Sequence, residues 1–145
     1  MRLKNTTTIP PDVVRAIVRF TCPPGVAGYD VKVAPLRSRG GTVKGRAYSR
    51  GSSYHATAAP FVNLYVREPG HFPCPPKPPC RPGYLPMPYF ASRVEALVYL
   101  AAHELRHLWQ ATHPRGRRVW GARGQFSERD ADAYAIRLLR AWRRR

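Results

Sequence analysis

Prolines decide where this chain can form regular secondary structure. Nine of its 16 prolines fall within residues 69–88. Proline has no backbone N–H to donate and fixes φ, so it is excluded from helix interiors and from the central strands of a sheet. We therefore predict that residues 69–88 form a stiff, extended loop, and that helices and strands lie before and after it.

The residues before this loop predict a short helix followed by strands. Residues 10–20 begin with Pro-Pro-Asp, and their valines and isoleucine recur at the spacing of one helical face. Apolar and polar residues then alternate in part, with turn residues between the runs. This pattern predicts about three strands, at residues 29–35, 42–48 and 61–67.

Two helices are predicted after the loop. Ser92 and Glu95 have the spacing of a capping box, and the helix that they begin is expected to cover residues 92–112 and to end before a proline. The second helix, over 127–144, carries arginines at its C-terminal end, where cations suit the helix dipole. A short helix and a small sheet followed by two helices predict one α+β domain over residues 1–145.

The chain is strongly basic, with 25 Lys and Arg against 8 Asp and Glu and a net charge of +17. Such an excess favours a nucleic-acid or acidic partner bound through Arg-rich segments, although a coding bias with solvated arginines gives the same composition. No apolar run approaches the roughly 18 residues of a membrane helix, and the polar N-terminus lacks the apolar core of a secretory signal. We expect a cytoplasmic protein with no membrane partner.

A histidine pair with metal-site spacing lies in the first of the two C-terminal helices. In the motif His103-Glu104-Leu105-Arg106-His107, both imidazoles lie on one helical face, within reach of one ion. Glu104 lies about 100° round the helix from His103, beside the open position of such an ion. Five histidines and four glutamates give this motif about 0.005 chance occurrences in the chain. The alternative is an ordinary polar helix face.

A catalytic zinc takes three protein ligands and leaves a fourth position for water, and two residues could supply the third ligand. Glu128 follows His107 by 21 residues, and Asp132, one turn further on, could accept the rear N–H of a ligating imidazole. Acids in a first helical turn also complement the helix dipole, which is the plain alternative. His113 extends the motif towards the metzincin pattern, but Gln110 stands where that pattern has the glycine that ends the helix.

The two C-terminal helices resemble the metal-binding unit of the gluzincin metalloproteases, and at this size the minigluzincins. The resemblance covers residues 92–140 and rests on His-Glu-x-x-His and on the downstream Glu-x-x-x-Asp that begins at Glu128. It implies a zincin-like fold, Zn²⁺ as cofactor and a peptide or protein substrate. It also implies roles for five residues: His103, His107 and Glu128 as zinc ligands, Glu104 as general base, and Asp132 as the hydrogen-bond partner of a ligating histidine.

The activity that the resemblance implies is hydrolysis of a peptide bond by a zinc-activated water, with Glu104 moving the proton. The family's oxyanion-stabilising residue has no motif match here, and Tyr134 and His113 are the candidates for it. Two rival functions stay open. One is a basic nucleic-acid-binding protein whose metal site is structural or non-catalytic. The other is a protease acting on DNA-associated proteins, as SprT-like proteases do, with the Arg-rich segment 113–126 as a basic rim.

The remaining features allow several interpretations. An odd count of three cysteines in a reducing compartment favours free thiols at Cys22, Cys74 and Cys80. A Cys₃His zinc site that includes His71, or a Cys74–Cys80 disulfide, is the alternative. The part of the proline-rich loop at residues 72–86 directly precedes the metal helix, so it either covers the cleft or is a plain spacer.

Overall fold

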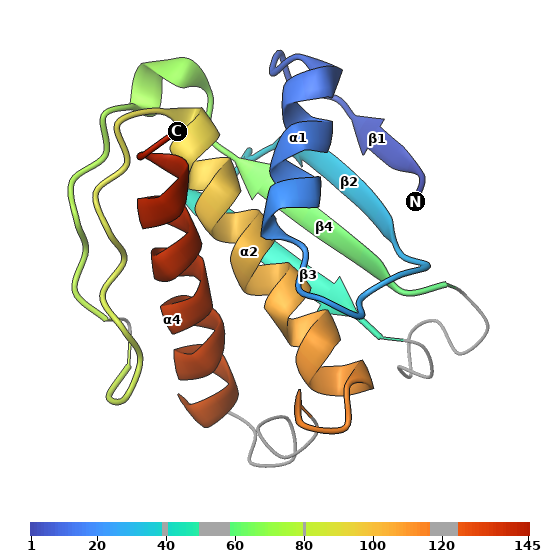
Figure 1. The fold of residues 1–145 in the computed structure, drawn as a ribbon. Helices are drawn as coiled ribbons and strands as arrows, with labels where there is room; N and C mark the ends of the chain where they lie inside the picture. The colour runs from blue at the N-terminus through green and yellow to red at the C-terminus, as the bar shows by residue number, and fades with distance from the viewer. Residues whose placement is uncertain (39–40, 50–58, 80, 117–124) are drawn as a thin grey trace.

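The computed structural model describes residues 1–38, 41–49, 59–79, 81–116 and 125–145 (Figure 1). Within these residues, three helices and a four-stranded mixed sheet make an α+β fold. The helix predicted at 10–20, the three predicted strands and both C-terminal helices are confirmed to within a few residues. The elements are β1 (Leu3–Asn5), α1 (Pro11–Thr21), β2 (Asp30–Pro35), β3 (Val43–Tyr48), β4 (Phe61–Val66), the 3₁₀ turn η1 (Pro69–His71), α2 (Arg93–Thr112) and α4 (Gln125–Trp142).

The sheet has the strand order β1-β2-β4-β3. β1 and β4 both pair with β2 in parallel, whereas β3 pairs with β4 in the antiparallel direction and forms one edge. Side chains alternate between the two faces. In β4, for example, Val62 and Leu64 are buried, while Asn63 and Tyr65 project from the opposite face and are partly exposed.

Strand β1 was not predicted from the sequence. It has only three residues, which are too few for alternation to be recognised. Its parallel pairing with β2 holds it in place, and the backbone N–H of Arg2 also donates to the Asp30 side chain at 2.8 Å. Tertiary pairing rather than local pattern therefore creates this strand.

All three helices lie on one face of the sheet (Figure 1). The apolar face of α1, including Val14 and Ile17, packs into a core with the inner residues of the strands and with α2. Helix α2 contacts α1, α4, β3 and β4, so it is the central helix of the layer. Each helix in the described residues is too short or too polar to cross a bilayer.

The proline-rich segment is extended, as predicted. Beyond the short turn η1 it contains only two isolated bridges among its described residues, Cys74 with Phe90 and Lys77 with Met87, and it runs beside α4 (Figure 1). Cys22 and Cys74 are free thiols. Cys80 lies outside the described residues, and the predictions of a free thiol or a disulfide at this position lie outside them too.

Candidate metal centre

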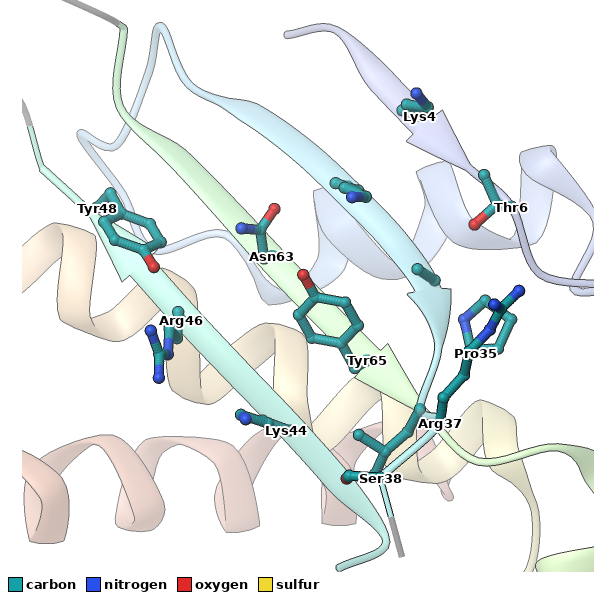
Figure 2. A pocket seen from close by; sticks show the side chains of 13 residues that line it. Lys4, Thr6, Pro35, Arg37, Ser38, Lys44, Arg46, Tyr48, Asn63 and Tyr65 are labelled. Carbon is teal, nitrogen blue, oxygen red and sulfur yellow. The ribbon is translucent and has the colours of Figure 1, made fainter. Parts of the chain in front are cut away.

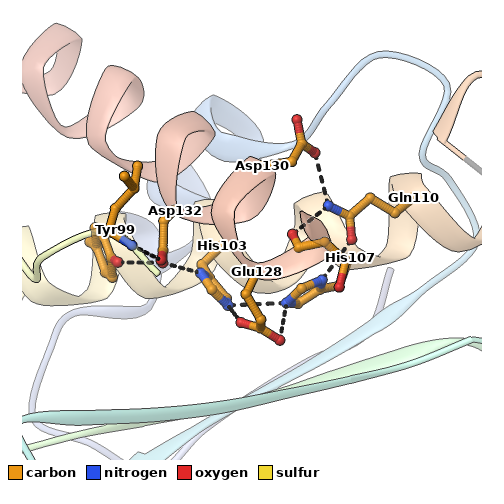
Figure 3. Close-up of polar contacts among 9 residues, drawn as sticks. Tyr99, His103, His107, Gln110, Glu128, Asp130 and Asp132 are labelled. Atoms are coloured by element: carbon orange, nitrogen blue, oxygen red, sulfur yellow. Dashed lines mark hydrogen bonds and ion pairs between the residues drawn. The ribbon is translucent and has the colours of Figure 1, made fainter. Parts of the chain in front are cut away.

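Side chains from α2 and α4 meet at one point. The Nε2 atoms of His103 and His107 are 3.0 Å apart, and the carboxylate oxygens of Glu128 lie 3.1 Å from His103 Nε2 and 3.4 Å from His107 Nε2 (Figure 3). The three potential ligand atoms all lie within 4.8 Å of one another. Among the described residues, no other group of three or more His, Cys, Asp or Glu comes together in this way.

Local sequence features explain how the two helices meet here. The Ser92 side chain accepts the Glu95 N–H at 3.3 Å, so the predicted serine cap begins α2. The Glu95 carboxylate accepts the N–H of Ala91, one residue before the cap, at 2.9 Å. On α4, Ala131 and Ala135 are fully buried. Small side chains let two helices approach closely, and Glu128 on α4 contacts both histidines of α2.

Asp132 fixes the orientation of the first imidazole. Its Oδ1 lies 3.0 Å from His103 Nδ1 and accepts the Tyr99 hydroxyl at 2.8 Å, and its Oδ2 accepts the Leu85 N–H at 3.3 Å. A carboxylate is an acceptor only, so His103 Nδ1 carries the proton and donates it to Asp132. With Nδ1 committed to Asp132, Nε2 of His103 faces the cluster and the Glu128 carboxylate.

Gln110 fixes the second imidazole in the same manner. It is fully buried, and its Nε2 donates to the Ser127 carbonyl and to Asp130, both at 2.8 Å. This leaves the amide oxygen to accept the proton of His107 Nδ1 at 2.8 Å (Figure 3). Arg106 holds Asp130 through two hydrogen bonds of 2.7 and 3.1 Å. His107, like His103, therefore turns its Nε2 atom towards Glu128.

The cluster attracts positive charge. Burial lowers the pKa of His103, but its hydrogen bonds to Asp132 and Glu128 outweigh this effect and raise the pKa to about 10. The hydrogen bonds from His103 and His107 hold the pKa of Glu128 well below its usual range. Two imidazole nitrogens and one carboxylate oxygen are a donor set of catalytic zinc sites, so these residues fit a divalent cation such as zinc.

Glu104 lies on α2, between the cluster and the edge strand β3. It is only 5% exposed, and its carboxylate accepts the Ala47 N–H. Burial raises the pKa of Glu104, while the two imidazoles of the cluster act to lower it. A pocket of about 380 Å³ is lined by the cluster, by Glu104 and by the β3 residues Gly45, Arg46 and Ala47.

Gly45 leaves the room that Glu104 occupies. A Cβ added at Gly45 would lie 2.2 Å from Glu104 Oε1 and 2.5 Å from both Cδ and Cγ. Contacts that short are essentially never found for real Cβ atoms. The side chain of Glu104 can therefore lie against β3 only because residue 45 has none.

The structure does not bring Tyr134 and His113 to this pocket. Tyr134 donates its hydroxyl to the Thr21 carbonyl at 3.1 Å, towards α1, because the stripe of α4 that carries it packs into the core. His113 follows the last residue of α2 in an extended conformation and stacks on Trp109, with ring centres 4.8 Å apart. Neither residue belongs to the cluster or lines the pocket.

Two segments were candidates for the border of the cleft, and the structure describes one of them well enough to test this. None of the described residues of 72–86 lines the pocket, which favours the spacer over the cover. The proline-rich loop instead contacts the cluster from behind, through the Leu85 N–H that binds Asp132. Most of the Arg-rich segment 113–126 lies outside the described residues, since the description stops at 116 and resumes at 125.

Sequence reasoning missed Gln110, Asp130 with Arg106, and Gly45 as parts of this site. From the sequence alone, Gln110 is expected only to favour continued helix. Its position three residues after His107, on the buried side of α2, is a signal that could have identified it as a hydrogen-bond partner. Gly45 gives no such signal, because its importance depends on a side chain from another element.

Comparisons with models of protein families, with curated proteins and with solved structures found no match to this chain. Inferences about its function therefore rest on the residues of the site.

Proposed function

We propose that this protein is a zinc-dependent metallopeptidase of the gluzincin type, with His103, His107 and Glu128 as the zinc ligands. The observation that carries the proposal is the convergence of these three donors beside a buried carboxylate, Glu104, that lines the same pocket. A structural zinc site needs four protein ligands and no adjacent base. Three ligands and a base are the requirements of hydrolysis.

The surrounding residues support the ligand roles. Asp132 and Gln110 each accept the rear N–H of one imidazole, so both rings turn Nε2 towards the position that zinc would occupy without having to reorient. When bound, zinc supplies Lewis acidity that polarises a carbonyl and lowers the pKa of a water molecule. The zincin-like fold is part of this proposal, supported by the element order of a short helix, a sheet, the metal helix and the glutamate helix.

Glu104 is the general base of the proposed reaction. It accepts a proton from the attacking water and delivers it to the leaving amine, so its charge is restored at the end of the cycle. Burial, which raises the pKa of this carboxyl, makes it a better proton acceptor than an exposed glutamate. The Ala47 N–H holds the carboxylate towards the pocket in the meantime.

A peptide substrate fits the edge strand. Strand β3 has β4 on one side and no described strand on the other, and Gly45, Arg46 and Ala47 line the pocket. Extended peptides bind to exposed strand edges through main-chain hydrogen bonds, which any sequence can supply, while pockets for side chains add specificity. This geometry favours an unfolded or loop segment of a protein as the substrate.

Glu104→Gln tests the proposal, with Glu68→Gln as a matched control on the exposed side chain of another glutamate. Zinc content is measured by mass spectrometry, and hydrolysis is measured with a fluorogenic peptide library. We expect one zinc per chain in all three proteins, and hydrolysis lost only in Glu104→Gln. A wild-type chain that binds no zinc, or a Glu104→Gln variant that cleaves peptides at the wild-type rate, would refute the proposal.

A further inference from the structure

The face of the sheet away from the helices is basic, and no described segment covers it. It forms a broad depression of about 610 Å³ lined by residues from all four strands and from the segment after β2 (Figure 2). The ionisable side chains of this lining, apart from two tyrosines, are all cationic: Lys4, Lys32, Arg37, Lys44 and Arg46. Asp30 also projects from this face, outside the depression, and is paired with Arg2 at 3.3 Å.

Strand register places these cations side by side. Lys4 is the direct partner of Lys32, which is the partner of Asn63, which in turn is the partner of Arg46. Three cations therefore share one row across four strands. Like charges directly opposite each other destabilise a sheet, so nothing in the fold itself favours this row.

Lysine is concentrated on this face. The chain has only four lysines among its 25 basic residues, and three of them, Lys4, Lys32 and Lys44, line the depression. All three are exposed. A general excess of arginine, spread over the surface by composition alone, does not produce this distribution.

Aromatic rings lie among the cations. Tyr65 is in β4, opposite Lys44 in β3, and both line the depression (Figure 2). Tyr48 stacks on Phe61 with ring centres 4.4 Å apart. Unpaired bases stack on such rings while their phosphates pair with Lys and Arg, whereas an acidic peptide has no need of the rings.

We infer that the open face of the sheet binds single-stranded nucleic acid, independently of any hydrolytic activity. Phosphates pair with Lys4, Lys32 and Lys44, and a base stacks on Tyr65. The Asn63 amide lies within the same row and offers both a donor and an acceptor to a base edge. A duplex keeps its bases stacked inside, out of reach of the Tyr65 ring on this face, so the single strand is the preferred form.

The test is fluorescence anisotropy with fluorescein-labelled 15-mers of thymidine and of uridine, from 50 to 200 mM salt. We expect Lys4→Gln, Lys32→Gln and Lys44→Gln combined to weaken binding at least about tenfold at 50 mM salt. In the same triple variant, the steepness of the negative slope of log K against log salt decreases by about 2, which is about 0.7 for each of the three lost phosphate contacts. Tyr65→Leu weakens binding about fivefold or more and leaves the slope unchanged. Binding to either the thymidine or the uridine 15-mer supports the inference, and the comparison shows whether DNA or RNA is preferred.

The matched control removes the same charge from the helical side, as Arg15→Gln, Arg19→Gln and Arg140→Gln combined. These arginines are exposed on α1 and α4, and the control is expected to change affinity less than twofold. Equal weakening in both triple variants, or a Tyr65→Leu variant that binds like wild type, would show attraction by net charge alone and overturn the inference. So would tighter binding to a 15-base-pair duplex or to phosphatidylserine vesicles. Circular dichroism checks folding, and Glu104→Gln should bind the 15-mers normally even if it never cleaves a peptide.

Discussion

Replacing Gly45 with alanine tests how closely strand β3 holds Glu104. The added Cβ would lie 2.2 Å from Glu104 Oε1, and ordinary contacts begin near 3.4 Å, so the carboxylate must retreat by about 1.2 Å (3.4 − 2.2). A misplacement of about 1 Å at a reacting group can lower a rate by about 100-fold. We therefore expect peptide hydrolysis to fall about 100-fold, with zinc content unchanged, because no ligand is touched.

Stability gives a second readout that does not depend on the proposed activity. Crowding of this kind lowers the free energy of unfolding by about 1–3 kcal/mol. In a chain of this size, a loss of about 2 kcal/mol lowers the melting temperature by roughly 4–8 °C. Gly70→Ala is the matched control, because a Cβ there meets nothing within 4 Å. It should melt like the wild type.

A double-mutant cycle identifies Glu104 as the group that Gly45→Ala displaces. Glu104→Asp shortens the side chain by one methylene, so the combined variant should be more stable than the sum of the single effects predicts, by about 1 kcal/mol. Hydrolysis should not recover, because the shorter carboxylate no longer reaches its position. If Gly45→Ala melts and hydrolyses like Gly70→Ala, Glu104 does not need the space at residue 45 and the reasoning is wrong.

Three further predictions concern the metal and its helix. His103→Ala should bind no zinc above background by mass spectrometry, whereas His71→Ala, outside the cluster, should bind one ion per chain. Gln110→Leu removes the acceptor for His107 Nδ1, so the affinity for zinc should fall about 10- to 100-fold. A competition titration with a chromophoric chelator measures this affinity, and an unchanged value would mean that His107 needs no such partner. Ser92→Ala removes the cap of α2 and should lower the free energy of unfolding by about 1 kcal/mol, which lowers the melting temperature by about 2–4 °C. An unchanged melting temperature would count against the capping geometry.

The sequence predicted those elements whose cause is local. The capping box and the following proline bracket α2, and the spacing within His-Glu-x-x-His puts two imidazoles on one face of any helix that contains it. The downstream pair Glu128 and Asp132 is also predictable, because residues four apart share a helical face. The structure places one beside both imidazoles and the other behind His103.

The features that sequence reasoning missed depend on contacts between elements. Strand β1 exists through its pairing with β2, and Gly45 matters only because α2 lies against β3. Tyr134 and His113 were candidates by residue type, but packing turns one towards α1 and the end of α2 places the other outside the pocket. Periodicity along a chain cannot supply such information, since it describes one element at a time.

The contacts that orient the two imidazoles join α2 to α4 without the help of an ion. Asp132 binds both His103 and Tyr99, and Gln110 binds both Asp130 and the carbonyl of Ser127. The cradle is therefore assembled by the fold itself. None of these bonds uses an atom that faces the metal position, so we expect a chelator to remove the ion without denaturing the protein.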